Sequence, residues 1–399
     1  MGTSNHTTTI QFEQHLRYFL LSLRKLPEQC SKLDSNRLTL VHFAVHSLDL
    51  LGFLEDEDHL FRCGTSKEAI INWIYSLQTS TCIPDERLVS EDCELDNKYY
   101  GFKGGTYLGE VPHNSLSWEY DHAHIAMTYT AICTLIALGD DLGQLDKKSV
   151  IHSLKVLQQQ DGSFQCAPVG SENDMRFLYC ACAISYVLND WRGVNISKAI
   201  EYIRSCHTYD GAFSLLPGQE GHGGSTFCAV AALFLMGKID EVLGSRRKEL
   251  IHWCVMRQMQ GMQGRPNKQE DTCYSFWIGG TLRLLESDHL LDQKALNAFV
   301  MDCQIDCVGG FSKLRNGLSP DLLHSFYSLA WLSLSTTSTS KERSINPDGS
   351  NMNSFDDTTN AKNEIIQTQQ NKTNMSLSNL HSALGIRQER VEMYWNNGA

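Results

Sequence analysis

LQQQDGSFQC at residues 157–166 is the first of four similar turns, followed by CHTYDGAFSL at 206–215, MQGMQGRPNK at 259–268 and VGGFSKLRNG at 308–317. Each turn places Gly shortly before a large apolar residue, and these marker residues are Phe164, Phe213, Met262 and Phe311. Successive markers are 49 residues apart in all three intervals. Because this length accommodates two ordinary helices and two loops, the sequence predicts a repeated helical hairpin.

The helix after each turn is rich in small and aromatic residues and carries few charges. These helices read FLYCACAISYVL, STFCAVAALFLM, CYSFWIGGTLRLL and HSFYSLAWLSLS. The segments before the turns, such as KKSVIHSLKVLQQQ and SRRKELIHWCVMRQ, have one charged face, which is typical of outer helices. KEAIINWIYSLQ and HIAMTYTAICTLIALG add an earlier unit, which makes at least five hairpins. We therefore expect an all-α fold, and the uncharged inner helices favour a closed, double-layered α–α barrel, or toroid.

The repeats divide the chain into three parts. We predict an α–α barrel catalytic domain at 1–334 and a polar, disordered low-complexity insert at 335–376. A C-terminal helix at 377–399 is expected to dock back on the barrel. Within the barrel, the acidic segment 79–100 is expected to form an inserted surface loop.

Composition narrows the class of protein. The 399 residues include 46 Asp and Glu against 34 Lys and Arg, and this net charge of −12 argues against an extended nucleic-acid surface. The longest apolar stretches fall short of the roughly 18 residues that a transmembrane helix needs. The N-terminus has no secretory signal pattern, so we expect the fourteen cysteines to be thiols of a cytoplasmic protein rather than a disulfide framework.

Polar residues recur 9 to 13 positions after the markers, at the start of each inner helix. They are Asp174, Arg176, His222, Asp271, Cys273 and His324. If the ring closes, they meet at one mouth of a central cavity, where the positive ends of the inner helices also gather. Asp271, Cys273 and His324 then form a three-ligand zinc set with an open fourth position. Taken singly, such an Asp is usually an N-cap and such a Cys a small core residue, but their joint placement favours the metal site.

A cationic loop lies next to this set. GRPNKQED places Arg265 and Lys268 before Asp271, with Tyr274 just beyond, and together with His222 these side chains can hold a diphosphate. A single Lys in such a loop is more often only solvated.

Aromatic residues on the inner helices are candidates for the lining of the cavity, although such stripes usually form only core. They are Tyr129, Tyr179, Phe227, Phe276 and Trp277. A zinc site, a cationic patch and an apolar lumen side by side match a thiol nucleophile, a diphosphate leaving group and a long hydrocarbon. The sequence therefore indicates S-prenylation.

The motifs resemble the β subunits of the protein prenyltransferases, and most closely those of geranylgeranyltransferase type I. The strings that carry the resemblance are YDHAHIAMTYTA, DGSFQCAPVGSENDMRFLYCA, HGGSTFCAVA, MQGRPNKQEDTCYSFWIGGTL and GGFSK followed by LLHSFY. The resemblance implies a catalytic β subunit in an obligate heterodimer with a helical-repeat α subunit. By family, Asp271, Cys273 and His324 match ligands of one zinc ion. His222, Arg265, Lys268 and Tyr274 match diphosphate contacts, and Arg176 matches a residue near the substrate.

Two further positions distinguish the members of the family by magnesium requirement and by the length of the prenyl donor. Farnesyl-transferring relatives have a magnesium-binding Asp after the last glycine turn, where this chain has Lys313, so the resemblance implies that magnesium is not required. Farnesyl enzymes have Trp at the cavity floor where this chain has Thr39, and the smaller residue favours a twenty-carbon prenyl donor, geranylgeranyl diphosphate. The implied acceptors are proteins with a C-terminal CaaX motif in which X is Leu, such as small GTPases.

Three alternatives remain open at this point. A farnesyltransferase or Rab geranylgeranyltransferase β subunit would share the fold and the zinc ligands, and Thr39 and Lys313 argue against the farnesyl enzyme. A helical-repeat scaffold without chemistry would not need Asp271, Cys273 and His324 together.

Overall fold

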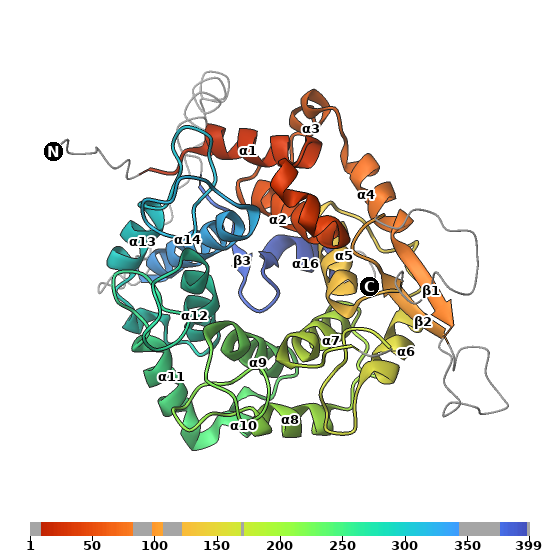
Figure 1. Cartoon of the computed structure of the whole chain (residues 1–399), viewed down its shortest axis with the longest axis vertical. Coiled ribbons are helices and arrows are strands. Elements are labelled where there is room, and N and C mark those ends of the chain that lie inside the picture. The colour runs from red at the N-terminus through yellow and green to blue at the C-terminus, as the bar shows by residue number, and fades with distance from the viewer. Residues whose placement is uncertain (1–8, 83–97, 107–121, 169–170, 343–375, 397–399) are drawn as a thin grey trace, which may run out of the picture.

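The structure, a computed structural model, describes residues 9–82, 98–106, 122–168, 171–342 and 376–396. Within these residues, six helices form the inner layer of a closed ring (Figure 1). In order around the ring they are α2 (Arg37–Leu50), α5 (Ile125–Ala137), α7 (Met175–Val187), α9 (Gly223–Leu235), α12 (Thr272–Leu284) and α14 (Leu322–Glu342). Each packs against the next, and α14 packs against α2, so the ring is closed. The predicted all-α toroid is confirmed.

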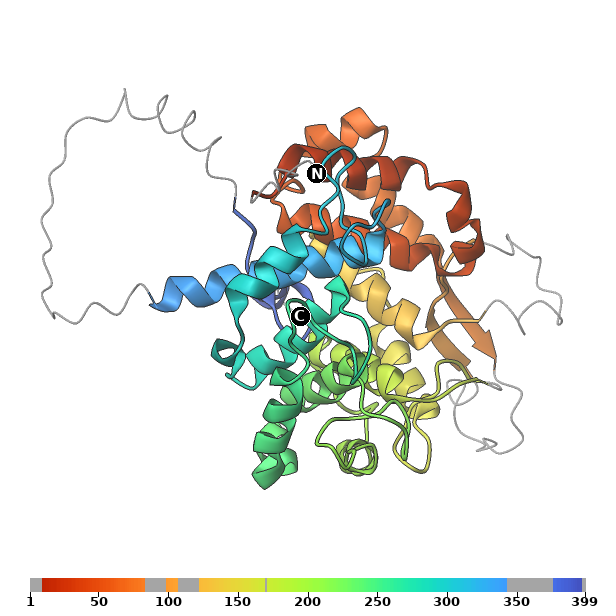
Figure 2. The same cartoon turned by 60° about the vertical axis from the view of Figure 1, so that its left-hand side comes forward.

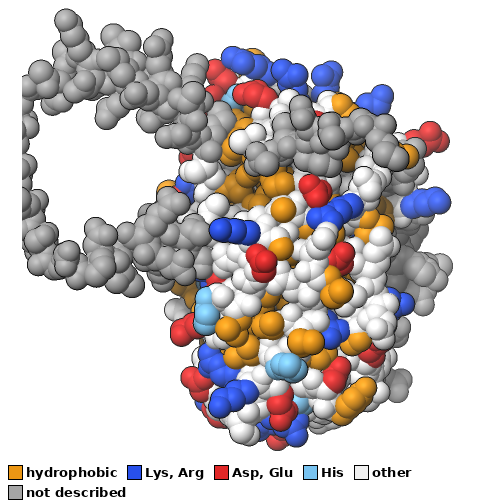
Figure 3. All heavy atoms as spheres, turned by 90° about the vertical axis from the view of Figure 1, so that its left-hand side faces the viewer, with side chains coloured by type: hydrophobic (Ala, Val, Ile, Leu, Met, Phe, Trp, Pro, Cys, Tyr) orange, Lys and Arg blue, Asp and Glu red, His pale blue; other side chains and the backbone are white. Residues whose placement is uncertain are grey.

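A second layer of helices surrounds this ring (Figure 1). It contains α1 (Phe12–Arg24), α4 (Lys67–Ser76), α6 (Lys147–Leu157), α8 (Ile196–Ser205), α11 (Arg247–Val255) and α13 (Gln293–Met301). Shorter helices lie in the connecting segments: η1 (Glu28–Asn36), α3 (Glu57–Cys63), α10 (Ile239–Leu243), η3 (Gly244–Arg246) and η4 (Asp288–Leu290). The outer face seen in Figure 3 mixes basic and acidic side chains with apolar ones, as the one-sided charge of these helices predicts.

The four marker residues occupy equivalent positions beneath the inner helices. Each is fully or almost fully buried and forms a β-bridge with a residue a few positions earlier in its own turn. In two repeats the marker's N–H donates to a hydroxyl on the next inner helix, from Phe213 to Thr226 (3.1 Å) and from Phe311 to Ser325 (2.8 Å). Glycine is needed at Gly162, since φ is +91° and a Cβ would lie 2.0 Å from the carbonyl oxygen of Lys198.

The predicted acidic loop at 79–100 has structured ends. Strands β1 (Gln78–Cys82) and β2 (Lys98–Phe102) pair antiparallel, and residues 83–97 lie outside the described residues. The expectation of loop was wrong for these ends because Tyr99 and Phe102 are buried and the backbone of β2 is anchored. The N–H of Tyr100 donates to Ser153 (2.8 Å) and that of Phe102 to Thr128 (3.0 Å).

The first residues of the predicted insert at 335–376 are helical. Helix α14 continues to Glu342 and extends beyond the body of the ring (Figure 2), while residues 343–375 lie outside the described residues. The division of the chain into domains at 334 and 376 therefore stays a prediction. Among the described residues, no helix is long and apolar enough to cross a membrane.

The C-terminal segment 376–396 returns to the ring and includes more than the predicted helix. Strands β3 (Leu380–His381) and β4 (Ile386–Arg387) form a short hairpin that enters the centre of the ring, and α16 (Gln388–Asn396) follows (Figure 1). We call residues 376–396 the C-terminal plug.

Candidate metal site and adjoining cavity

The polar residues found by counting from the markers cap the inner helices at one end of the ring. The side chains of Asp174, His222 and Asp271 each accept a hydrogen bond from the N–H two residues later. His124, at the start of α5, does the same. The N-cap reading was therefore correct for Asp271, and it places the carboxylate at the positive end of α12.

Asp271, Cys273 and His324 converge at this end of the ring. Their potential ligand atoms all lie within 4.8 Å of one another, and His324 Nε2 is 3.2 Å from Asp271 Oδ1. Asp271 and Cys273 are buried and His324 is partly buried, so the three groups are shielded from most solvent. A carboxylate, a thiol and an imidazole held this closely are a donor set that suits zinc with a fourth position open.

The protonation of these three groups reflects the close spacing of acidic and basic atoms. Burial raises the pKa of Cys273 well above its ordinary value, and the charge of Asp271 raises it further. Burial lowers the pKa of His324, but hydrogen bonds with Asp271 and Asp321 outweigh it and raise the pKa to about 9. Burial raises the pKa of Asp271, but hydrogen bonds from His324 and Cys273 hold it below its usual range. The cluster therefore holds protons that a divalent cation would displace.

Asp321 is a carboxylate beside the cluster that the sequence analysis did not name. Its Oδ2 lies 2.6 Å from His324 Nδ1, while its Oδ1 accepts the backbone N–H of His324 (2.9 Å). With Nδ1 engaged by a carboxylate, the proton of a neutral His324 stays on Nδ1 and leaves Nε2 as a lone pair toward Asp271 and Cys273. Asp321 stands 10 residues after Phe311, as Asp174 does after Phe164, so the same counting would have found it.

Lys313 adds positive charge beside the cluster. Its Nζ lies 3.5 Å from Asp271 Oδ2, and its side chain is more than half exposed. Its backbone carbonyl accepts the N–H of Thr272 (3.1 Å), which ties the last glycine turn to the start of α12. The ammonium group is therefore available to an anionic ligand that approaches from solvent.

His222 and Tyr274 form a donor pair on the neighbouring helices. His222 Nδ1 accepts the N–H of Gly224 (3.1 Å), so its proton lies on Nε2 and is donated to the Tyr274 hydroxyl (2.9 Å). The hydroxyl proton of Tyr274 is then free to bind a ligand. Gly264 is required here because a Cβ would lie 2.1 Å from the tyrosine ring.

Arg265 and Lys268 lie on the loop before Asp271 as the sequence predicted. Arg265 Nη1 pairs with Glu220 Oε2 at 2.6 Å, so an anion must compete with Glu220 for the guanidinium. Lys268 is exposed. Burial and the charge of Arg265 lower the pKa of His222, so this imidazole is a neutral donor in the group.

A cavity of about 1100 Å³ opens beside His324 and extends into the ring. Its walls are mainly aromatic and aliphatic, and all seven cavity residues that the sequence analysis named line it: Thr39, Tyr129, Arg176, Tyr179, Phe227, Phe276 and Trp277. The diphosphate candidates lie outside its lining, whereas His324 of the metal cluster belongs to the lining. The volume and lining suit a long hydrocarbon chain.

Arg176 and Thr39 lie on the wall of this cavity. Arg176 is held by Asp174 Oδ2 at 2.6 Å and Glu172 Oε2 at 2.9 Å, and the bond with Asp174 raises its pKa, so it is a fixed cation at the wall. Thr39 lies in the first turn of α2, with its Oγ1 3.5 Å from Met127 Sδ. Thr39 therefore belongs to the wall near the metal end, not to the floor that the resemblance implied.

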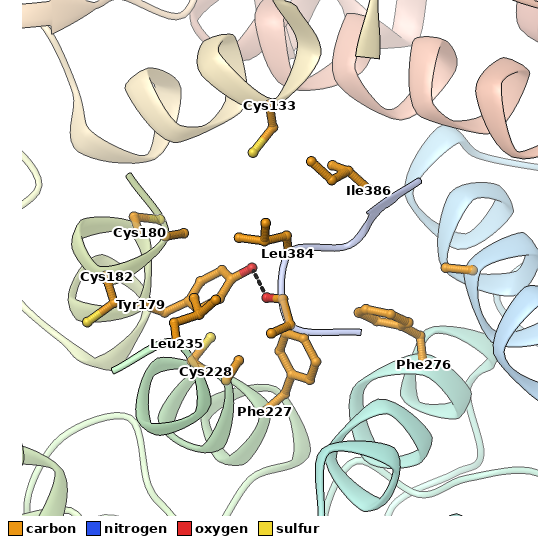
Figure 4. Close-up of a cluster of buried hydrophobic side chains, with 14 of the residues drawn as sticks. Cys133, Tyr179, Cys180, Cys182, Phe227, Cys228, Leu235, Phe276, Leu384 and Ile386 are labelled. Atoms are coloured by element: carbon orange, nitrogen blue, oxygen red, sulfur yellow. Dashed lines mark hydrogen bonds between the residues drawn. The ribbon is translucent and has the colours of Figure 1, made fainter. Parts of the chain in front are cut away.

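The C-terminal plug supplies two lining residues that the sequence analysis missed, Leu384 and Gly385. The hydroxyl of Tyr129 donates to the carbonyl oxygen of Leu384 (2.8 Å), and that of Tyr179 donates to the carbonyl oxygen of Ala383 (2.8 Å; dashed line in Figure 4). No sequence repeat marks this segment, so counting from the markers could not find it.

Comparison with known proteins places this chain in a family. Residues 10–377 match the prenyltransferase alpha-alpha toroid domain. The chain is 39% identical to a geranylgeranyl transferase type-1 subunit beta from Arabidopsis thaliana, over 83% of this chain and 86% of the relative. The protein of the same name from Dictyostelium discoideum is 38% identical, over 81% of this chain and 90% of the relative.

A solved structure shares the fold. The Candida albicans protein geranylgeranyltransferase-I complexed with GGPP has a TM-score of 0.71 with this chain, covering 97% of this chain and 98% of that chain at 21% sequence identity.

Proposed function

The chain belongs to the prenyltransferase α–α toroid family, in the group of type I geranylgeranyltransferase β subunits, and we propose that it transfers a geranylgeranyl group to protein cysteines by zinc-dependent chemistry. The observation that carries the proposal is that His324 belongs both to the candidate metal cluster and to the wall of the apolar cavity. Asp271, Cys273 and His324 lie within 4.8 Å of one another, and His324 also lines the apolar cavity of about 1100 Å³. A thiol acceptor and a hydrocarbon donor can therefore meet there.

The proposed cofactor is one zinc ion held by Asp271, Cys273 and His324. The mixed oxygen, sulfur and nitrogen donor set fits zinc, and three protein ligands leave a position for an acceptor thiol. A bound zinc ion supplies positive charge that lowers the pKa of such a thiol. Asp321 would hold His324 in the tautomer that presents Nε2 to the ion.

The remaining polar residues are proposed to stabilise the leaving group. In the reaction, the acceptor sulfur, whose proton has gone to solvent, forms a bond to C1 of the prenyl donor while the bond from C1 to the diphosphate oxygen breaks. The departing diphosphate would accept a hydrogen bond from the Tyr274 hydroxyl, which His222 orients through its Nε2–H, and would be neutralised by Arg265 and Lys268. Lys313, 3.5 Å from Asp271 Oδ2, adds a fixed charge where farnesyl enzymes are expected to use magnesium. We therefore propose that magnesium is not required.

The preferred prenyl donor is proposed to be geranylgeranyl diphosphate, and the acceptors CaaX proteins in which X is Leu, such as small GTPases. Thr39 supports the longer donor because its small side chain leaves the cavity wall open where farnesyl enzymes have Trp. We further propose a separate α subunit as obligate partner and the cytoplasm as the place of action.

Metal analysis and transfer assays of the heterodimer test this proposal. The wild-type complex should contain about one zinc per heterodimer and transfer from the twenty-carbon donor faster than from the fifteen-carbon donor, without added magnesium. Cys273→Ala should lose both zinc and transfer. Cys254→Ala, which removes a fully buried thiol from α11, is the matched control and should retain both.

Two results would contradict the proposal. A purified complex without zinc would exclude the metal chemistry and favour a non-catalytic scaffold. Faster transfer of the fifteen-carbon group would instead favour the farnesyl alternative.

A further inference from the structure

The C-terminal plug enters the ring at the end opposite the metal cluster. The inner helices all begin on the side of Asp271 and His324, and the plug bonds to groups at their far ends. The N–H of Ser378 donates to the carbonyl oxygen of Leu50, the last residue of α2 (2.8 Å). Trp395 Nε1 donates to the carbonyl oxygen of Val187, the last residue of α7 (3.2 Å). The plug therefore closes one end of the lumen.

The tip of the plug is a tight, buried turn. The N–H groups of Leu384 and Gly385 both donate to the carbonyl oxygen of His381, at 3.2 and 2.9 Å. Gly385 has φ of +68°, a conformation that glycine adopts without strain. The side chain of Leu384 is fully buried, and both Leu384 and Gly385 line the cavity. The tip is thus a fixed surface and not a loose tail.

Two tyrosines of the ring hold this tip in place. The hydroxyl groups of Tyr129 on α5 and Tyr179 on α7 donate to the plug carbonyls of Leu384 and Ala383, both at 2.8 Å. The hydroxyl oxygens are 3.1 Å apart, so the two bonds form one cluster. Because the plug engages these polar tips, the rings can face the cavity without leaving an unsatisfied hydroxyl against a hydrocarbon chain.

The side chain of Leu384 projects into space left by small residues. In Figure 4 it extends from the plug tip toward Cys133 on α5 and Cys180 on α7, and Cys228 on α9 lies nearby. Cys180 and Cys228 also line the cavity. Thiols are small, so the inner wall is recessed at this point and Leu384 is the bulky side chain that fills the recess.

We infer that the C-terminal plug ends the hydrocarbon cavity and that Leu384 is a specificity-determining residue for the length of the prenyl donor. This inference rests on the proposed function, because it needs a donor with a long hydrocarbon chain. Thr39 lies on the wall in the first turn of α2, whereas Leu384 belongs to the plug that closes the far end. Donor length is then limited at two places, one on the wall and one on the floor.

The test compares prenyl donors of 15, 20 and 25 carbons on one tagged acceptor, using the purified heterodimer. Leu384→Ala removes three carbon atoms from the closed end of the cavity and should raise the kcat/KM ratio of the 25-carbon to the 20-carbon donor by about tenfold or more. Leu384→Trp shortens the cavity and should shift the ratio of 20-carbon to 15-carbon donor by a similar factor in favour of the shorter one. Zinc content should stay at the wild-type level in both variants.

Two further variants separate cavity depth from general damage to the plug. Met393→Ala removes a half-exposed side chain from α16 and should leave all donor ratios unchanged. Tyr179→Phe removes one bond to the plug tip without changing its volume, and it should relax discrimination against the 25-carbon donor. If Leu384→Trp fails to fold, Leu384→Ala and Tyr179→Phe still decide the question.

The outcomes are distinguishable. Suppose that the wild type transfers the 20-carbon group and that Leu384→Ala and Tyr179→Phe both keep donor ratios within twofold of wild type. This result would overturn the role of the plug and leave the proposed function standing. A zinc-loaded wild-type complex that transfers no 20-carbon group would overturn the proposed function and this inference with it.

Discussion

At the scale of single residues, the cluster depends on a carboxylate that is not itself one of the three proposed ligands. Asp321 uses one oxygen to cap α14 through the N–H of His324 (2.9 Å) and the other to hold His324 Nδ1 (2.6 Å). One side chain therefore fixes both the helix start and the direction of the imidazole. Mutation of a residue that hydrogen-bonds to a metal ligand in this way commonly lowers metal affinity by about 10- to 100-fold.

Asp321→Asn should separate these two roles. The amide oxygen can still cap α14, but the negatively charged partner of His324 is lost, so zinc affinity should fall by about 10- to 100-fold with little change in helix content. Asp292→Asn is the matched control, because Asp292 caps the outer helix α13 through the N–H of Ala295 (3.0 Å). Zinc affinity is measured by competition with a chelator. Equal affinities for wild type and Asp321→Asn would show that Asp321 acts only as a cap.

Counting along the repeat found most of this site and missed parts of it for a physical reason. Asp271 and Cys273 are fixed to the start of α12, so their distance from Met262 predicted where they lie. Asp321 escaped because the distance from the marker to the polar residue varies between 9 and 13, and only His324 was taken from the last repeat.

At the scale of elements, the first and last repeats are joined by α1. His15 on this helix is fully buried and stacks on Phe311 with ring centroids 4.9 Å apart. Its Nδ1 accepts the N–H of Gly310 (2.9 Å), so its proton lies on Nε2 and is donated to Gln304 Oε1 (3.0 Å). Protonation would place a second donor against the N–H of Gly310, and burial lowers the pKa of His15 to about 4.

His15 should therefore make the docking of α1 sensitive to acid. A folded-state pKa below the unfolded value of 6.5 gives stability that is complete above pH 6.5 and is lost as pH falls toward 4. Between pH 7.5 and 5 the loss from this one group is about 2 kcal/mol.

The measurement is the free energy of unfolding as a function of pH for wild type and His15→Gln, which cannot be protonated. The difference between the two proteins should be largest at pH 7.5 and shrink toward pH 5. Because both proteins contain the other buried histidines, the contribution of those residues to the pH dependence cancels in the difference. His252→Gln, on the exposed face of α11, is the control. Parallel profiles for wild type and His15→Gln would contradict the assignment.

The elements that the sequence did not predict are those outside the repeat. The 49-residue step indicated the inner and outer helices because each repeat buries the same faces. The plug and the strands β1 and β2 have no counterpart in other repeats, and their conformation is set by distant partners. Tyr129 lies 255 residues from Leu384, and no local pattern in the sequence reveals that contact.

At the scale of the whole molecule, the ring is held closed by contacts between the ends of the chain. Helix α14 packs against α2, and the plug adds a buried ion pair between Arg390 of α16 and Asp49 of α2. Arg390 Nη2 lies 2.8 Å from Asp49 Oδ1, and both side chains are almost completely buried. The same guanidinium reaches Glu55 at 2.8 Å. This pair anchors the plug to the inner helix that also carries Thr39.

Arg390→Met should destabilise the molecule because it leaves Asp49 buried without its main partner. Burial already raises the pKa of Asp49 despite the hydrogen bonds from Arg390. After the substitution only the longer contact with Arg387 Nη1 (3.5 Å) remains, so the buried carboxylate is costly. Breaking such a pair typically lowers the free energy of unfolding by about 3–5 kcal/mol, whereas replacing both members with apolar residues is often neutral. The double variant Asp49→Leu with Arg390→Met should therefore recover most of the loss in a urea titration. If it stayed as unstable as Arg390→Met alone, the cost would come from lost packing of α16, and the ion pair would not be what closes the ring.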